Sequence, residues 1–262
     1  MALISKLEAI GDAIREKTGG TDLLTLDGMA EAIAGIQAGG GGDADDMVMG
    51  TITEYSSDNV TTIRDNAFSE CGSITAVSFP NATYIGGYAF EKCKKLTSVN
   101  LPNVTSSDNY VFTGCEKLKT VNLPKITHVG SYLFSSCKNL TSINLPSVTR
   151  LDGQAFGTCE KLETAKIPNV THISNYSFIR CYSLVALVIE QTDGVCNLVN
   201  TDAFSDCYHI LGTVNSKYNP EGLKDGYIYV PDALVEDYKA ATKWSTYADQ
   251  IKPLSEYVEV TE

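Results

Sequence analysis

Eight cysteines and three histidines are the residues of this 262-residue chain whose chemistry could serve catalysis or metal binding. Seven of the cysteines recur regularly: six are spaced by 22 residues, and the seventh follows after 26. The CxxC and Cys/His spacings of zinc fingers and redox motifs are absent. A cysteine that occurs once per repeat is typical of a buried column, so we expect these thiols to act as small apolar spacers. The column consists of Cys71, Cys93, Cys115, Cys137, Cys159, Cys181 and Cys207.

Other chemistry is possible for the same residues. Stacked cysteines roughly 5 Å apart lie within disulfide range, but each has equivalent neighbours on both sides, so we expect reduced thiols, in agreement with assembly in a cytoplasm. His128 and His172 occupy one repeat position two turns apart, and about 10 Å is too far to share a metal. Cys207 lies near His209 but belongs to the buried column. We therefore predict no catalytic residue, no metal site, no cofactor and no enzymatic activity.

Two further columns have residue types that suit binding. Aromatic side chains on a rigid face give a large contact area at low entropic cost, which suits sugar rings or protein anchors. The alternative is that the tyrosines only cover the flank, and the Thr, Ser and Asn side chains of the strand face form another candidate surface. The tyrosine column is Tyr88, Tyr110, Tyr132 and Tyr176, interrupted by Gln154, and the variable column is Tyr84, Ser106, His128, Arg150 and His172.

Several more columns share this period and define the fold. In the segment LTSVNLP (96–102), Leu96, Val99 and Leu101 are expected to face inward, and the prolines to end the strands. We predict a right-handed solenoid of seven turns, mainly β with short helical turns at YxFxxC, roughly 30–35 Å long. Cys196 aligns with the apolar position of Val170. The phenylalanines of the structural ladder are Phe68, Phe90, Phe112, Phe134, Phe156, Phe178 and Phe204.

The repeat LPNVTxIGxxxFxxCxxLxxVNLP over about residues 51–215 resembles the BspA-like (Treponema-type) leucine-rich repeats of bacterial surface proteins. This resemblance implies a leucine-rich-repeat solenoid with an adhesive or interaction role. It names no ligand.

Charge and composition distinguish the two flanks of the chain from the solenoid. The net charge of -12 lies mainly in the flanks, which argues against nucleic acid as a partner. No apolar run is long enough to span a membrane. We predict a helical attachment or oligomerisation segment at 1–38, a Gly/Asp linker at 39–46, the solenoid at 47–215, and a C-terminal cap at 216–262. In the cap, Leu234, Tyr238 and Trp244 are expected to cover the last turn.

The N-terminal segment resembles those of tail and tail-fibre proteins of phages of Gram-positive gut bacteria. The matching elements are Ala13-Ile14-Arg15, Lys17-Thr18-Gly19 and Leu26-Asp27-x-Met29-Ala30. This resemblance implies a phage or prophage tail protein, made in the bacterial cytoplasm and carried on the virion, that binds a host-surface protein or glycan. Residues 1–38 would then join other tail proteins or copies of the chain. The alternatives are a BspA-like adhesin on the bacterial cell surface and a purely structural spacer.

Overall fold

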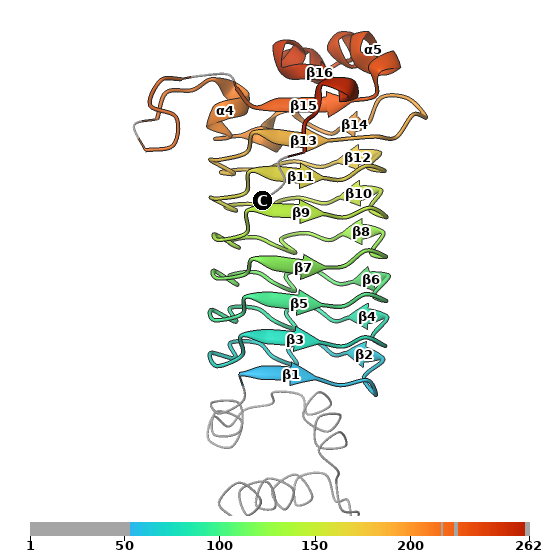
Figure 1. The fold of residues 1–262 in the computed structure, drawn as a ribbon, viewed down its shortest axis with the longest axis vertical. Helices are drawn as coiled ribbons and strands as arrows, with labels where there is room; N and C mark the ends of the chain where they lie inside the picture. Colours follow the sequence, from blue (N-terminus) through green and yellow to red (C-terminus); the bar gives the residue numbers. More distant parts are fainter. Residues whose placement is uncertain (1–52, 216, 223–224, 260–262) are drawn as a thin grey trace, which may run out of the picture.

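The computed structural model describes residues 53–215, 217–222 and 225–259, so the predicted segments 1–38 and 39–46 lie outside the described residues. Figure 1 shows a rod of stacked coils with helices gathered at its C-terminal end. Each coil contains a three-residue strand and, further along the chain, a two-residue strand. We call the first set the front strands and the second set the side strands.

The front strands are β1 (Glu54–Ser56), β3 (Ala76–Ser78), β5 (Ser98–Asn100), β7 (Thr120–Asn122), β9 (Ser142–Asn144), β11 (Thr164–Lys166) and β13 (Ala186–Val188). The side strands are β2 (Thr62–Ile63), β4 (Tyr84–Ile85), β6 (Ser106–Ser107), β8 (His128–Val129), β10 (Arg150–Leu151), β12 (His172–Ile173) and β14 (Asn197–Leu198).

All pairing between these strands is parallel, and almost all of it joins residues 22 apart, as in Val77 with Val99. The ladder is interrupted in two places: the front strands divide between β7 and β9, and the side strands divide between β6 and β8. The expected alternation in LTSVNLP is confirmed, because Leu96, Val99 and Leu101 are buried while Asn100 is exposed. Equivalent side chains therefore form columns along the rod.

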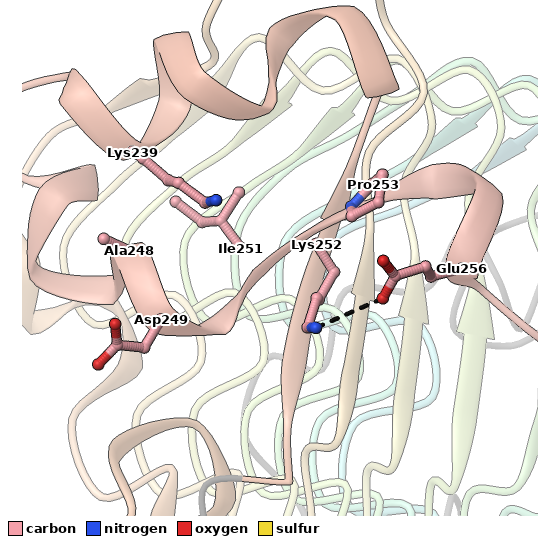
Figure 2. A pocket seen from close by; sticks show the side chains of 7 residues that line it. All are labelled: Lys239, Ala248, Asp249, Ile251, Lys252, Pro253 and Glu256. Atoms are coloured by element: carbon pink, nitrogen blue, oxygen red, sulfur yellow. Dashed lines mark ion pairs between the residues drawn. The ribbon is translucent and has the colours of Figure 1, made fainter.

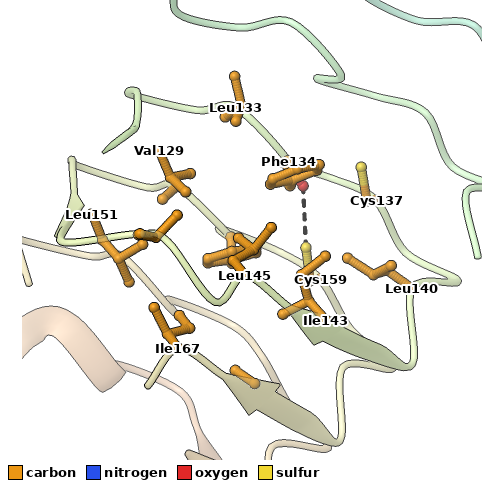
Figure 3. Packing of buried hydrophobic residues seen from close by; sticks show 14 of the residues in the cluster. Val129, Leu133, Phe134, Cys137, Leu140, Ile143, Leu145, Leu151, Cys159 and Ile167 are labelled. Carbon is orange, nitrogen blue, oxygen red and sulfur yellow. Dashed lines mark hydrogen bonds between the residues drawn. The ribbon is translucent and has the colours of Figure 1, made fainter. Parts of the chain in front are cut away.

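The phenylalanine and cysteine columns form the centre of the core. Consecutive phenylalanine rings stack 5.1–5.5 Å apart along the whole rod. The Sγ of Cys159 donates to the carbonyl oxygen of Phe134 in the preceding turn at 3.1 Å (Figure 3). The same bond recurs from Cys93 to Cys207, and all eight cysteines are buried and free. Each thiol thus finds an acceptor inside the core, on a carbonyl group that also accepts a backbone N–H, as that of Phe134 does from Cys137.

The YxFxxC segments differ from the helical turns that the sequence predicts. In the first six repeats they are successive tight turns, and the seventh contains a 3-10 helix, η1 (Thr201–Phe204). The reason is that two residues in these segments adopt left-handed backbone angles, as at Tyr88 with φ 58° and Lys92 with φ 54°. Each such residue breaks a regular helix.

The seventh turn holds the four extra residues. The register pairs His172 with Asn197, which places Cys196 opposite Thr171 rather than in the row of Val170, so the expected alignment is off by one. The insertion is divided between the two sides of β14, which explains the shift. Cys196 is nevertheless buried because the cap covers it: the Nε1 of Trp244 donates to its carbonyl oxygen at 2.6 Å.

The C-terminal segment 216–262 extends the front sheet as well as covering it. Strand β15 (Tyr227–Val230) pairs with β13, and β16 (Ile251–Pro253) pairs with β15, both in parallel. Helix α4 (Tyr208–Leu211) precedes this segment, and the described helices within it are η2 (Asp232–Leu234), α5 (Val235–Ala240), η3 (Trp244–Gln250) and η4 (Leu254–Glu256). Tyr238 and Trp244 are buried against the last turn, and Leu234 packs beside them, as expected. Among all the residues that the structure describes, no helix has the length and apolar character needed to cross a membrane.

Candidate functional site

The tyrosine column lies just after the side strands, three residues beyond each. The rings of Tyr88, Tyr110 and Tyr132 stack with centroids 4.9 and 4.7 Å apart and planes within 8° of parallel. Gln154 ends this stack, and its Nε2 donates to the Tyr132 hydroxyl at 2.8 Å. Tyr176 stands beyond Gln154 and, like Tyr88, exposes 40% of its surface. The repeat therefore brings three of the four predicted tyrosines into one cluster and leaves the fourth apart.

The tyrosine column has left-handed backbone geometry, one of two such positions in the repeat. The tyrosines have φ between 58° and 63°, the left-handed region that a bulky residue rarely adopts. Asn66, which suits this region better, occupies the same position in the first turn with φ 58°. Strain of about 1–2 kcal/mol per tyrosine is thus tolerated where a cheaper residue would fit. Gln154 in this column, and Lys92 and Arg180 four residues beyond it, have the same left-handed angle, so the repeat imposes it on different side chains.

The stack determines which part of each ring can meet a ligand. In the near-parallel arrangement, neighbours cover both faces of Tyr110, so its edge and hydroxyl remain for contact. Desolvation, and secondarily the adjacent Tyr132 and Tyr88, raises the pKa of Tyr110. The phenol stays protonated at neutral pH and can donate a hydrogen bond. The stack therefore offers a row of ring edges and hydroxyls instead of a platform of open faces.

The variable column lies next to the tyrosines, and neighbouring carboxylates contact three of its side chains. The hydroxyl of Tyr84 donates to Asp108 at 2.6 Å, which raises its pKa to about 12. His128 and Arg150 both contact the carboxylate of Asp152, at 2.9 and 2.8 Å.

His172 contacts Asn197 at 3.0 Å. Desolvation, and then the charge of Arg150, lowers its pKa. Because Asp152 forms an ion pair with Arg150 and also contacts His128, the variable column presents mixed polarity with little net positive charge.

The cysteines take no part in an exposed site. Burial raises the pKa of the Cys93, Cys159 and Cys196 thiols to about 12, so they are not thiolates at neutral pH. Across residues 53–259, where described, no three His, Cys, Asp or Glu side chains group in a way that could hold a metal ion.

A second aromatic cluster was missed by the sequence analysis. Tyr182 and Tyr208 stack at 5.2 Å, and Tyr218 stacks on Tyr182 at 4.3 Å. The hydroxyl of Tyr218 donates to Glu160 at 3.1 Å, and Lys217 lies over the Tyr218 ring at 4.5 Å. The first two tyrosines each follow a column cysteine, and this shared position was the available signal. Tyr218 comes from the loop after α4, which no periodicity reaches.

The cap contains a depression of about 310 Å³ (Figure 2). Its cations are already paired: Lys239 contacts Glu236 at 3.0 Å, and Lys252 contacts Glu256 at 3.4 Å. Ala248, Asp249, Ile251 and Pro253 complete its lining. This opposite-charge pairing leaves no concentrated charge for a ligand, so the depression is a weaker candidate than the tyrosine column.

Known proteins share this repeat and this fold. Residues 61–185 match the family model for the BspA type leucine rich repeat region in six copies. The fold is a leucine-rich-repeat solenoid, and its repeats match the BspA type over these residues. Proteins with BspA-type repeats are generally binding proteins, often on cell surfaces. No curated protein sequence matches the chain significantly.

Two crystal structures of leucine-rich repeat proteins are similar to this fold. That of the T. pallidum leucine rich repeat protein has a TM-score of 0.55 and 27% identity, over 66% of this chain and 80% of that chain. That of a leucine-rich repeat protein from Eubacterium ventriosum has a TM-score of 0.53 and 26% identity, over 67% of this chain and 47% of the other. The chain thus spans about half the length of the second relative.

Proposed function

We propose that the chain is a non-enzymatic binding protein whose tyrosine column contacts a component of a host cell surface. The observation that carries this proposal is the stack of Tyr88, Tyr110 and Tyr132 on left-handed backbone, partly exposed along a rigid rod. A stack fixed by the repeat loses little side-chain entropy on binding, so its contact area contributes efficiently to affinity. The matched family supports a binding role, since BspA-type repeats generally serve one.

The biological setting in this proposal is a phage or prophage tail. It rests on the resemblance of the N-terminal segment to tail and tail-fibre proteins. Residues 1–38 attach the chain to other tail proteins or to copies of itself, and the solenoid meets a host protein or glycan. The protein is made in the bacterial cytoplasm and then carried on the virion.

Binding to host material tests the first part. The full chain is screened against glycans, cell-wall fragments and intact cells, together with Tyr110→Ala and Tyr132→Ala. Each variant removes a ring and is expected to weaken binding at least about ten-fold, the effect of an interface hot spot. Tyr257→Ala is the matched control, because Tyr257 is a half-buried tyrosine in the C-terminal tail. Equal losses in all three variants, with their folds intact, would reject the tyrosine column as the binding surface.

Deletion of residues 1–46 tests the tail assignment. Light scattering should show an oligomer for the full chain and a folded monomer after the deletion. A full chain that is already monomeric and joins no tail protein would contradict attachment through this segment.

The match to BspA-type repeats favours one alternative, a bacterial surface adhesin. Detection of the protein on intact bacteria that lack phage genes would support the adhesin. A folded chain that binds no host material would leave a structural spacer as the remaining function.

A further inference from the structure

We propose that a second surface, separate from the tyrosine column, binds an extended polymer with regularly spaced phosphate groups, such as a phosphodiester-linked cell-wall polymer. We call this surface the lysine edge. It lies in the bends at 94–97, 116–119 and 138–141, which precede the front strands β5, β7 and β9. These bends follow one side of the rod, at the left in Figure 1, whereas the side strands lie at the right. The lysine edge consists of Lys94, Lys95, Lys117, Lys119 and Lys138.

Charge is concentrated in these three bends. They contain five lysines and a single acid, Glu116, in a chain whose net charge is -12. The following bend carries Glu160 and Glu163 beside Lys161, so the positive strip ends there. At physiological ionic strength charges more than about 8 Å away are largely screened, so local residues decide which ions gather at this edge.

Hydrogen bonds between bends keep them aligned. The Nδ2 of Asn139 donates to the carbonyl oxygen of Glu116 at 2.7 Å, and the Nζ of Lys161 donates to Asn139 at 2.8 Å. Successive bends therefore lie directly over each other at the strand spacing of about 4.8 Å. The lysine positions therefore follow one another along the rod axis, which suits an extended chain better than a compact anion.

Most of these ammonium groups are available. Lys94, Lys95, Lys117 and Lys119 are exposed and make no ion pair within the described part of the chain. Lys138 lies 3.9 Å from Glu160, at the limit of an ion pair. Lys92 gives the contrast, since it contacts Glu70 at 2.9 Å and is already neutralised. Four unpaired cations on adjacent turns repel one another, and a polyanion would relieve that repulsion.

The residue types indicate the class of polymer. Lysine ammonium groups on flexible stems bind phosphate as point charges, without the planar fork by which arginine recognises carboxylates and phosphates. The three bends, with sequences KKLT, EKLK and KNLT, contain no aromatic residue. Single-stranded nucleic acid is usually held by stacking on aromatic rings, so this surface favours a polymer without bases.

The test measures binding of the full chain to poly(glycerol phosphate), with neutral dextran as the uncharged probe and double-stranded DNA as the rival polyanion. Four or five phosphate contacts give a salt slope of about 3, so affinity should fall roughly 60-fold between about 50 and 200 mM salt. The test variant combines Lys94→Gln, Lys95→Gln, Lys117→Gln and Lys119→Gln. The control removes the same charge elsewhere with Lys125→Gln, Lys166→Gln, Lys239→Gln and Lys252→Gln.

The proposal predicts that the test variant loses at least about ten-fold in affinity at low salt and most of its salt slope, while the control keeps both. Equal losses in the two variants would show that overall charge matters and would overturn the proposal. Absence of poly(glycerol phosphate) binding, or tighter binding to DNA, would also overturn it. Because none of the eight positions belongs to the tyrosine column, these outcomes leave the tyrosine proposal to be judged separately.

Discussion

Replacement of Ser107 by valine should stabilise the protein. Ser107 occupies an inward position of the side strands, where the neighbouring turns place the fully buried Ile85 and Val129. Its Oγ is buried and has no hydrogen-bond partner. The ladder of side strands is also interrupted here. The backbone N–H of Asp152 donates to the carbonyl oxygen of Val129 at 2.9 Å, but the equivalent bond from the N–H of Gly130 to the carbonyl oxygen of Ser107 is not formed. The serine is therefore a local defect in an otherwise apolar column.

The expected gain follows from two contributions and one penalty. Valine adds two buried methyl groups, worth about 1.6 kcal/mol together. It also removes an unpaired buried hydroxyl, which costs about 1–3 kcal/mol. Fitting the larger side chain into a packed column takes back roughly 1–3 kcal/mol. We expect the free energy of unfolding to rise by about 1–2 kcal/mol, or the midpoint temperature by about 3–6 °C.

Urea denaturation gives the measurement, followed by far-UV circular dichroism for the whole rod and by fluorescence of Trp244 for the capped end. Ser106→Val is the matched control, because Ser106 is adjacent but exposed, and its effect should stay within about 0.5 kcal/mol. A lower midpoint for Ser107→Val, or equal shifts in both variants, would refute the assignment of Ser107 as a packing defect.

Three further predictions concern the core and its charges. Phe134→Ala should lower the free energy of unfolding by about 3–5 kcal/mol in urea, and Phe134→Leu by clearly less, because the ring stacks at 5.4 Å on both neighbours. Iodoacetamide at mildly alkaline pH should label Cys159 only as fast as the chain unfolds, since burial raises the pKa of its thiol to about 12; rapid labelling of the folded chain would contradict this. Because the pKa of His172 is lowered in the folded state, the folded chain takes up a proton there less readily than the unfolded chain. The contribution of His172 to the free energy of unfolding is therefore intact above about pH 6.5 and is lost as the pH falls. His172→Asn should therefore make urea midpoints decline less steeply below that pH, and an unchanged slope would exclude this effect.

The sequence predicted the columns well because a repeat samples each position several times. A single inward leucine such as Leu96 proves little, but its recurrence every 22 residues fixes both the fold and the burial. The cap residues Tyr238 and Trp244 were also found, since the last turn of any solenoid must be covered. The predictions that succeeded therefore concern properties that the repeat imposes on every turn.

Features that belong to one turn could not be predicted in the same way. The defect at Ser107 depends on the absence of a partner, which composition does not reveal. The shift of Cys196 depends on how an insertion divides around β14, and Tyr218 reaches its cluster from outside the repeat. The lysine edge escaped notice because its charges are scattered along the sequence, and stacking alone brings Lys94 and Lys117 together.

The tyrosines and the lysines suit different stages of attachment, because their side chains differ in freedom and charge. The backbone and the ring stack restrict Tyr110, so its contacts depend on shape and hydrogen bonding, which salt hardly affects. Lysines such as Lys95 have flexible stems and gain affinity from ion release and long-range attraction, which salt weakens. Under the two proposals, the lysine edge raises the rate of capture and the tyrosine column sets the lifetime of the complex. Higher salt should then slow association with host cells while leaving dissociation nearly unchanged. Tyr110→Ala should instead speed dissociation while leaving association nearly unchanged.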